Sequence, residues 1–319
     1  VNFTFEIDEA GNNEWKTLKS VTVNAGKATS VPFLSTERGE WIRVKTDKNT
    51  MATVSFNYTS PDIRSTSSDS IYKGLTTVDK TTTTGGLLYG LGDNRRALGL
   101  LANVTVDGKI SETGYYEMGD KLELIRKEDA KTADLIRSKF AIPQQVISIE
   151  ESSVLVVDDL GRRWRLPLGN ETYKKLTDQG VLRICREVAT ERDLFSCMGT
   201  FYELPAENAD GYAKIRPVST HNYRINDYAS YRGMLVLTGV TPEDGKENPH
   251  VVISDDGKAA VWVGVIDDLW TLGKPVGQGG PWKDTDVKTD VASDPYLIAF
   301  YDKKELSLSH RSDKNVVIT

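Results

Sequence analysis

Cysteine and histidine are scarce in this chain of 319 residues, which has two cysteines and three histidines. Cys185 and Cys197 are too few for a disulfide framework, so two buried free thiols are expected, with a pair across neighbouring strands as the alternative. The three histidines lie far apart in the sequence, and no Cys/His cluster has the spacing of zinc ligands. The sequence therefore predicts neither a metal site nor a cofactor.

The chain also lacks an excess of positive charge and long apolar runs. The formal net charge is −6 at pH 7, and nucleic acid is not an expected partner because phosphate binding needs a basic surface. No run approaches the roughly 18 apolar residues of a membrane span. The chain has neither an initiator Met nor a signal-like segment at Val1, so we interpret it as mature, trimmed or excised from a longer protein with further domains.

Alternation of apolar and polar residues is the main pattern in the sequence. In residues 1–60 this alternation is broken by Gly, Asn and Asp turns, which predicts an antiparallel β-meander that is either a blade or an appended sheet. Residues 61–84 are polar and predict a linker or a surface excursion. Residues 85–319 are predicted to form the main β-domain.

Local signals within residues 85–319 predict individual elements. The Asp-Gly step at Asp107 predicts a two-residue hairpin. Apolar spacing predicts a helix over 127–140 and a second short helix near 171–178. The Gly-rich stretch between Asp267 and Asp294 predicts a long loop, a feature that is usually functional.

One hairpin pattern recurs in 7–15, 156–164 and 253–262. Each copy has a strand-like run, an acidic residue, a Gly turn and a Trp on the returning strand. The physical reason is local, since Asp caps the turn and Gly adopts a positive φ. Short strands with a repeated hairpin favour an all-β propeller of about five to seven blades, with a multi-sheet β-sandwich as the alternative.

The copy with Asp159, Gly161 and Trp164 resembles the Asp-box hairpin of sialidase-type β-propellers, although Val157 stands where that motif has Ser. Longer phrases, such as G-G-L-L-Y-G-L-G-D-N-R-R-A-L-G-L-L-A, are similar to secreted proteins of polysaccharide-degrading bacteria such as Bacteroidetes. The chain also resembles, distantly, the propeller polysaccharide lyases that act on uronate-containing glycans with His, Tyr and Arg. These resemblances imply a secreted or periplasmic carbohydrate-active protein whose partner is a polysaccharide or an oligosaccharide.

Residues 199–233 hold the densest cluster of chemically active side chains. A lyase must neutralise a uronate carboxylate, remove a proton and protonate the leaving oxygen. His221 is the candidate base and Tyr228 or Tyr231 the candidate acid. The arginines that would clamp the carboxylate are Arg216, Arg224 and Arg232.

Further residues are predicted to bind substrate. They are Asn222, Glu203 and Asp227 of the same stretch, Arg95 and Arg96 of a Gly-Asp-Asn-Arg-Arg turn, and Trp270 and Trp282 as sugar-stacking aromatics. Solvated loop charges and structural Trp anchors are the competing interpretation. Two other functions also remain open: a glycoside hydrolase with paired carboxylates, and a non-catalytic module that binds glycan or protein.

Overall fold

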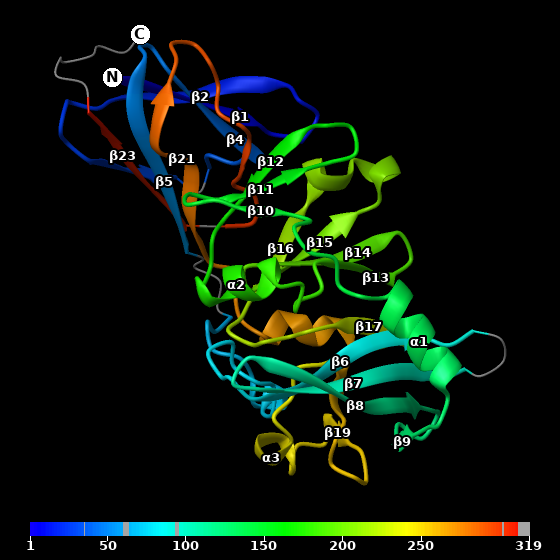
Figure 1. Ribbon diagram of the computed structural model, residues 1–319. Coiled ribbons are helices and arrows are strands. Elements are labelled where there is room, and N and C mark those ends of the chain that lie inside the picture. Colours follow the sequence, from blue (N-terminus) through cyan, green and yellow to red (C-terminus); the bar gives the residue numbers. More distant parts are fainter. Residues whose placement is uncertain (35, 60–63, 93–95, 302, 312–319) are drawn as a thin grey trace.

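The computed structural model describes residues 1–34, 36–59, 64–92, 96–301 and 303–311 and arranges their strands in five sheets (Figure 1). Strands make up 47% and helices 12% of the structure. None of the described sheets closes into a barrel. The prediction of an all-β protein with several sheets is therefore confirmed.

Two sheets face each other across the largest hydrophobic core, to which residues outside these two sheets also contribute. The seven-stranded sheet has the order β10 (Ser148–Ile149), β11 (Val154–Val157), β12 (Arg163–Leu166), β22 (Tyr296–Leu297), β4 (Trp41–Thr46), β1 (Asn2–Asp8) and β2 (Trp15–Thr22). The four-stranded partner has the order β21 (Gly277–Val287), β5 (Thr50–Thr59), β23 (Lys303–His310) and β3 (Thr29–Phe33). Ring contacts cross between them, with centroids 6.1 Å apart for Phe5 and Phe33 and 5.0 Å for Phe56 and Tyr296.

The three remaining sheets have four strands each. Two are meanders of consecutive strands: β6 (Thr83–Gly90), β7 (Leu98–Val106), β8 (Lys109–Met118) and β9 (Leu124–Arg126); and β13 (Cys185–Ala189), β14 (Arg192–Cys197), β15 (Thr200–Pro205) and β16 (Arg216–Thr220). The third has the order β17 (Tyr228–Tyr231), β18 (Met234–Leu237), β20 (Ala260–Gly264) and β19 (Val251–Ile253). Figure 1 shows strands from both ends of the chain together at one end of the molecule, with β6–β9 at the other end.

Helical segments are short. They are α1 (Ala130–Lys139), α2 (Thr172–Asp178), α3 (Pro242–Gly245) and the 3-10 turns η1 (Ser70–Tyr72), η2 (Glu207–Ala209), η3 (Gly211–Lys214) and η4 (Ile266–Thr271). The Asp129 side chain caps α1 by accepting from the Thr132 N–H at 3.0 Å. Both predicted helices are confirmed. No helix in the described part of the chain is long and apolar enough to cross a membrane.

Turn chemistry explains several connections. Asp107 and Gly108 both have positive φ and join β7 to β8 in a two-residue hairpin, as predicted. In the 156–164 hairpin the carboxylate that caps the turn belongs to buried Asp158, which accepts from the Arg162 N–H at 2.8 Å and from the Trp164 indole at 2.9 Å. The neighbouring Asp159, named from the sequence pattern, is exposed.

The prediction of a long loop between Asp267 and Asp294 is wrong. The stretch contains η4 and the strand β21, which pairs with β5. The glycines explain the difference: a Cβ added at Gly280 would lie 1.7 Å from the Val54 carbonyl oxygen, so Gly is needed there for close approach of two backbones. Residues of the polar 61–84 segment also pack inside the structure, where Tyr72 is fully buried and stacks on Trp262. Cys185 and Cys197 are unpaired.

Candidate functional site

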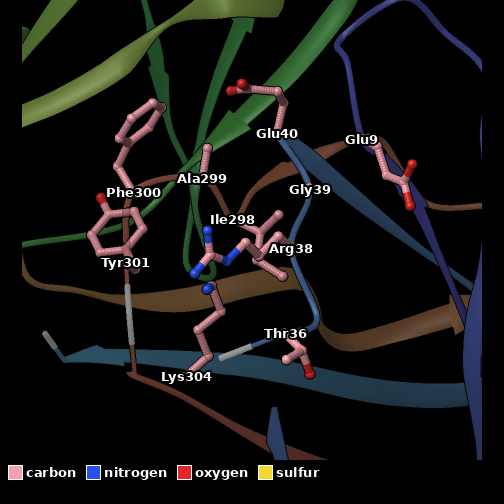
Figure 2. A pocket seen from close by; sticks show the side chains of 10 residues that line it. All are labelled: Glu9, Thr36, Arg38, Gly39, Glu40, Ile298, Ala299, Phe300, Tyr301 and Lys304. Carbon is pink, nitrogen blue, oxygen red and sulfur yellow. The ribbon is translucent and has the colours of Figure 1, made fainter. Parts of the chain in front are cut away.

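A cavity of about 480 Å³ lies beside the edge where β22 leads into β23 (Figure 2). It is lined by Glu9, Thr36, Arg38, Gly39, Glu40, Ile298, Ala299, Phe300, Tyr301 and Lys304. These residues come from the β1–β2 turn, from the approach to β4, from the β22–β23 connection and from the start of β23. Segments far apart in the sequence thus build a concave surface on the rigid two-sheet core.

Backbone hydrogen bonds hold the segments of the cavity together. The Glu40 carbonyl accepts from the N–H groups of Ile298 at 3.2 Å and Ala299 at 3.3 Å, and the Glu40 N–H donates to the Asp8 carbonyl at 3.0 Å. Gly39 packs tightly, since a Cβ at that position would lie 3.1 Å from the Cβ of Ile7. The wall that carries Glu40 is therefore fixed in place.

Phe300 stands out in this wall. Its φ is +63°, a left-handed conformation that costs a bulky residue roughly 1–2 kcal/mol. Its side chain is 50% exposed, and the Arg216 guanidinium lies 4.8 Å from the ring centroid. A strained backbone that presents an exposed aromatic ring at a cavity is a feature of binding sites.

Glu40 supplies an acceptor. Its Oε2 atom is buried and has no hydrogen-bond partner among the described residues. Burial raises the pKa of Glu40 above the ordinary value, although the positive charges of Arg216 and Lys214 act in the opposite direction. A hydroxyl group of a ligand can satisfy this oxygen.

Two cations line the same cavity. Figure 2 shows the Arg38 guanidinium and the Lys304 ammonium turned toward the same space, beside Tyr301. The second carboxylate in the lining, Glu9, forms an ion pair with Lys16 at 2.9 Å. Neighbouring positive groups of this kind attract an anionic ligand, with the Arg fork suited to a carboxylate.

The predicted base, His221, is placed elsewhere. Its ring lies 5.0 Å from that of Phe201 and stacks with that of Tyr223, and only 8% of the residue is exposed. Burial lowers the pKa of His221 to about 3, so the imidazole is neutral at physiological pH. Nδ1 accepts from the Tyr223 backbone N–H at 3.1 Å. His221 and Asn222 line a second cavity, of about 350 Å³.

The predicted acids and clamps do not gather around His221. The fully buried Tyr228 hydroxyl donates to the carbonyl of Leu194 at 2.6 Å. The Tyr231 hydroxyl donates to the Arg96 carbonyl at 2.8 Å and accepts from Arg232 Nε at 3.0 Å, so those three residues form a group of their own.

The two remaining predicted arginines also lie apart. Arg216 lies beside Phe300 at the first cavity. Arg224 is buried, with its Nε atom unpartnered among the described residues, and burial lowers its pKa.

Most of the predicted substrate-binding residues are paired with, or packed against, other residues of the chain. Asp227 is fully buried between Arg183, at 3.0 Å, and Arg186, at 3.2 Å. Glu203 pairs with Arg192, and Asn222 accepts from the Asn170 side chain at 3.0 Å.

Trp282 is buried in the two-sheet core and contacts Phe3. Trp270 is 51% exposed and has the Arg64 guanidinium 4.8 Å from its ring. Arg95 lies outside the described residues.

Sequence reasoning did not find Arg38, Glu40, Phe300 or Lys304. The charged turn T-E-R-G-E before the buried β4 is the one available signal, because charge next to a buried strand marks a loop at its mouth. No sequence pattern indicates the left-handed backbone conformation of Phe300.

Within the described residues, no group of three or more His, Cys, Asp and Glu side chains is arranged to hold a metal ion. Comparisons with protein families, curated proteins and solved structures found no match.

Proposed function

We propose that this chain is a secreted or periplasmic β-module that binds an acidic oligosaccharide or polysaccharide without cleaving it. The binding site is the cavity of Figure 2. One observation carries the proposal: an exposed Phe300, held at positive φ, stands at a cavity lined by Arg38 and Lys304.

The chemistry of the lining matches an acidic sugar. The Phe300 ring offers an apolar face against which a pyranose ring can pack. Arg38 and Lys304 provide charge-assisted donors for a uronate carboxylate. Glu40 Oε2 accepts from a sugar hydroxyl, which relieves its unpartnered state.

The surroundings of His221 favour binding over a lyase reaction. A base needs an available lone pair and a pKa near the working pH, whereas Nδ1 of His221 accepts a backbone N–H and the pKa is about 3. The hydroxyl of Tyr228 donates to backbone carbonyls deep in the core. These three observations support the non-catalytic alternative.

Glycoside hydrolysis is the second candidate. One observation favours it: Glu40, whose pKa is raised by burial, lines the same cavity as a second carboxylate, Glu9. A general acid with a raised pKa opposite another carboxylate is the arrangement that glycosidases use. Release of new reducing ends from a glycan, lost in Glu40→Gln, would favour this candidate.

The strand order of the sheets bears on the choice between a propeller and a sandwich. Two four-stranded meanders, β6–β9 and β13–β16, have the strand order of propeller blades. The seven-stranded sheet is wider than a blade and shares its core with the β21–β5–β23–β3 sheet. We therefore favour a multi-sheet sandwich with blade-like meanders attached.

Phe300→Ala tests the site, with Trp270→Ala as its matched control. Both rings are about half exposed and both have an arginine 4.8 Å away. Calorimetric titration with an oligouronate is expected to show affinity at least tenfold weaker for Phe300→Ala, the effect of losing about 1.4 kcal/mol of ring contact.

The control variant Trp270→Ala is expected to bind the oligouronate with the affinity of the wild type. The reverse pattern, with binding lost in Trp270→Ala and kept in Phe300→Ala, would move the site to the other aromatic. Equal affinity of the wild type for neutral oligosaccharides would contradict the role given to Arg38 and Lys304.

A further inference from the structure

The cavity of about 350 Å³ beside His221 is independent of the Phe300 site. It is lined by Thr66, Ser67, Ser68, Thr77, Thr220, His221, Asn222, Tyr223, Lys274 and Val276. Five of these residues carry aliphatic hydroxyls, one carries a cation, and no carboxylate takes part in the lining. Such a surface is polar and carries no negative charge.

The hydrogen bonds of His221 fix its tautomer. Nδ1 accepts from the Tyr223 backbone N–H, so in the neutral imidazole the proton is on Nε2. Nε2 is buried and has no hydrogen-bond partner among the described residues. The ring therefore holds a buried donor that an acceptor atom of a ligand can satisfy.

The cavity walls are fixed by their own contacts. The Ser68 hydroxyl donates to the Leu272 carbonyl at 2.5 Å, and the Thr220 hydroxyl donates to the Val276 carbonyl at 3.1 Å. The Lys274 N–H donates to the Ser65 carbonyl at 2.9 Å, which joins the two segments that form the rim. These two hydroxyls give their protons to backbone carbonyls, so they hold the walls rigid around His221 and Lys274.

We propose that this cavity is a second binding site and that it takes a carboxylate group, held by His221 Nε2–H and by Lys274. The carboxylate can belong to a free small acid or to a uronate sugar. A neutral imidazole binds it as a hydrogen-bond donor, and Lys274 provides the charge.

The experiment uses the full chain labelled with ¹⁵N-histidine, which has three histidines to resolve. The His221 signals are assigned from the loss of one set in His221→Gln. Acetate, glucuronate and glucose are titrated into the wild type while the Nε2 resonance is followed. Acetate and glucuronate are expected to shift it in a saturable way and glucose to leave it unchanged.

Two variants locate the effect. Lys274→Met is expected to weaken acetate binding about tenfold, whereas Lys258→Met, which removes an exposed charge elsewhere, leaves it unchanged. Phe300→Ala is also expected to leave it unchanged, so failure here is distinguishable from failure of the glycan site.

Saturation with glucuronate alone would assign the site to a uronate sugar, and saturation with both acids to any small carboxylate. The absence of a saturable shift with either acid, or an equal shift with glucose, would overturn the proposal.

Discussion

Glu40 carries a buried carboxylate oxygen without a hydrogen-bond partner among the described residues, and such a group lowers stability when it is charged. Because burial raises the pKa of Glu40 above 4.5, the folded protein binds this proton more tightly than the unfolded chain does. Stability therefore falls as the pH rises from about 4.5 through the folded pKa.

Glu40→Gln is expected to raise the melting temperature at pH 7 by about 2 °C, since it removes the charge and keeps the shape. The gain is expected to disappear below about pH 4.5, where the wild-type carboxyl is protonated in both states. Thermal unfolding of both proteins at pH 4 and pH 7 measures this difference in melting temperature. Glu9→Gln, at an exposed ion pair, is the control without this profile. A wild type more stable than Glu40→Gln at pH 7 would contradict the account of Glu40.

Asp158 and Asp159 offer a second test at single residues. Asp158 accepts from four groups of its own turn, the backbone N–H groups of Leu160 and Arg162, the Arg162 Nε–H and the Trp164 indole. Asp158→Ala is expected to cost about 1–3 kcal/mol in urea unfolding, because it leaves these donors without their partner. Asp159→Ala is expected to change stability by less than about 0.5 kcal/mol. Equal effects would contradict the assignment of the cap.

At the scale of elements, Asp227 connects three sheets. Its carboxylate, just before β17, accepts from the Leu88 N–H of β6 at 2.9 Å and from Arg186 of β13 at 3.2 Å. Arg183, just before β13, donates to both carboxylate oxygens. The residue predicted to contact substrate thus supports the contact between β6–β9, β13–β16 and the β17 sheet.

Asp227→Ala is expected to destabilise the protein by about 3–5 kcal/mol, since it leaves two largely buried arginines without their shared carboxylate. Urea unfolding measures the loss, and circular dichroism at 25 °C confirms that the variant is folded. Glu203→Ala, which breaks a more exposed ion pair, is expected to cost less than about 1 kcal/mol. A loss below 1 kcal/mol for Asp227→Ala would show that the sheets are held together without this network.

The elements that the sequence predicts well are those with local causes. The hairpin at Asp107–Gly108 and the helix capped by Asp129 each depend on side chains within a few residues. The sequence of β21 predicts a loop because its glycines serve the close approach of β5, a partner more than two hundred residues away. Periodicity indicates that a strand exists and not where it pairs.

At the scale of the whole molecule, the sequence predicts the all-β class, and the arrangement of the sheets follows from long-range pairing. Strands of residues 1–60 pair with strands from 277–310, and β22 of that segment joins β4 to β12. The same long-range contacts build the cavity beside Phe300. The sequence therefore predicts a site at the His, Arg and Tyr cluster of 199–233, whereas the proposed binding site lies elsewhere. Most side chains of that cluster face the core or other neighbours.

We propose that the protein binds acidic glycans through the Phe300 cavity and leaves them intact. The most direct measurement is calorimetric titration of the wild type with an oligouronate and with a neutral oligosaccharide of equal length, followed by assay of unsaturated uronate and of reducing ends in the same samples. We expect the oligouronate alone to bind, with an affinity that falls as added salt screens the ion pairs, and we expect no product of either kind. Unsaturated uronate that is absent with His221→Ala, or an oligouronate that does not bind, would contradict it.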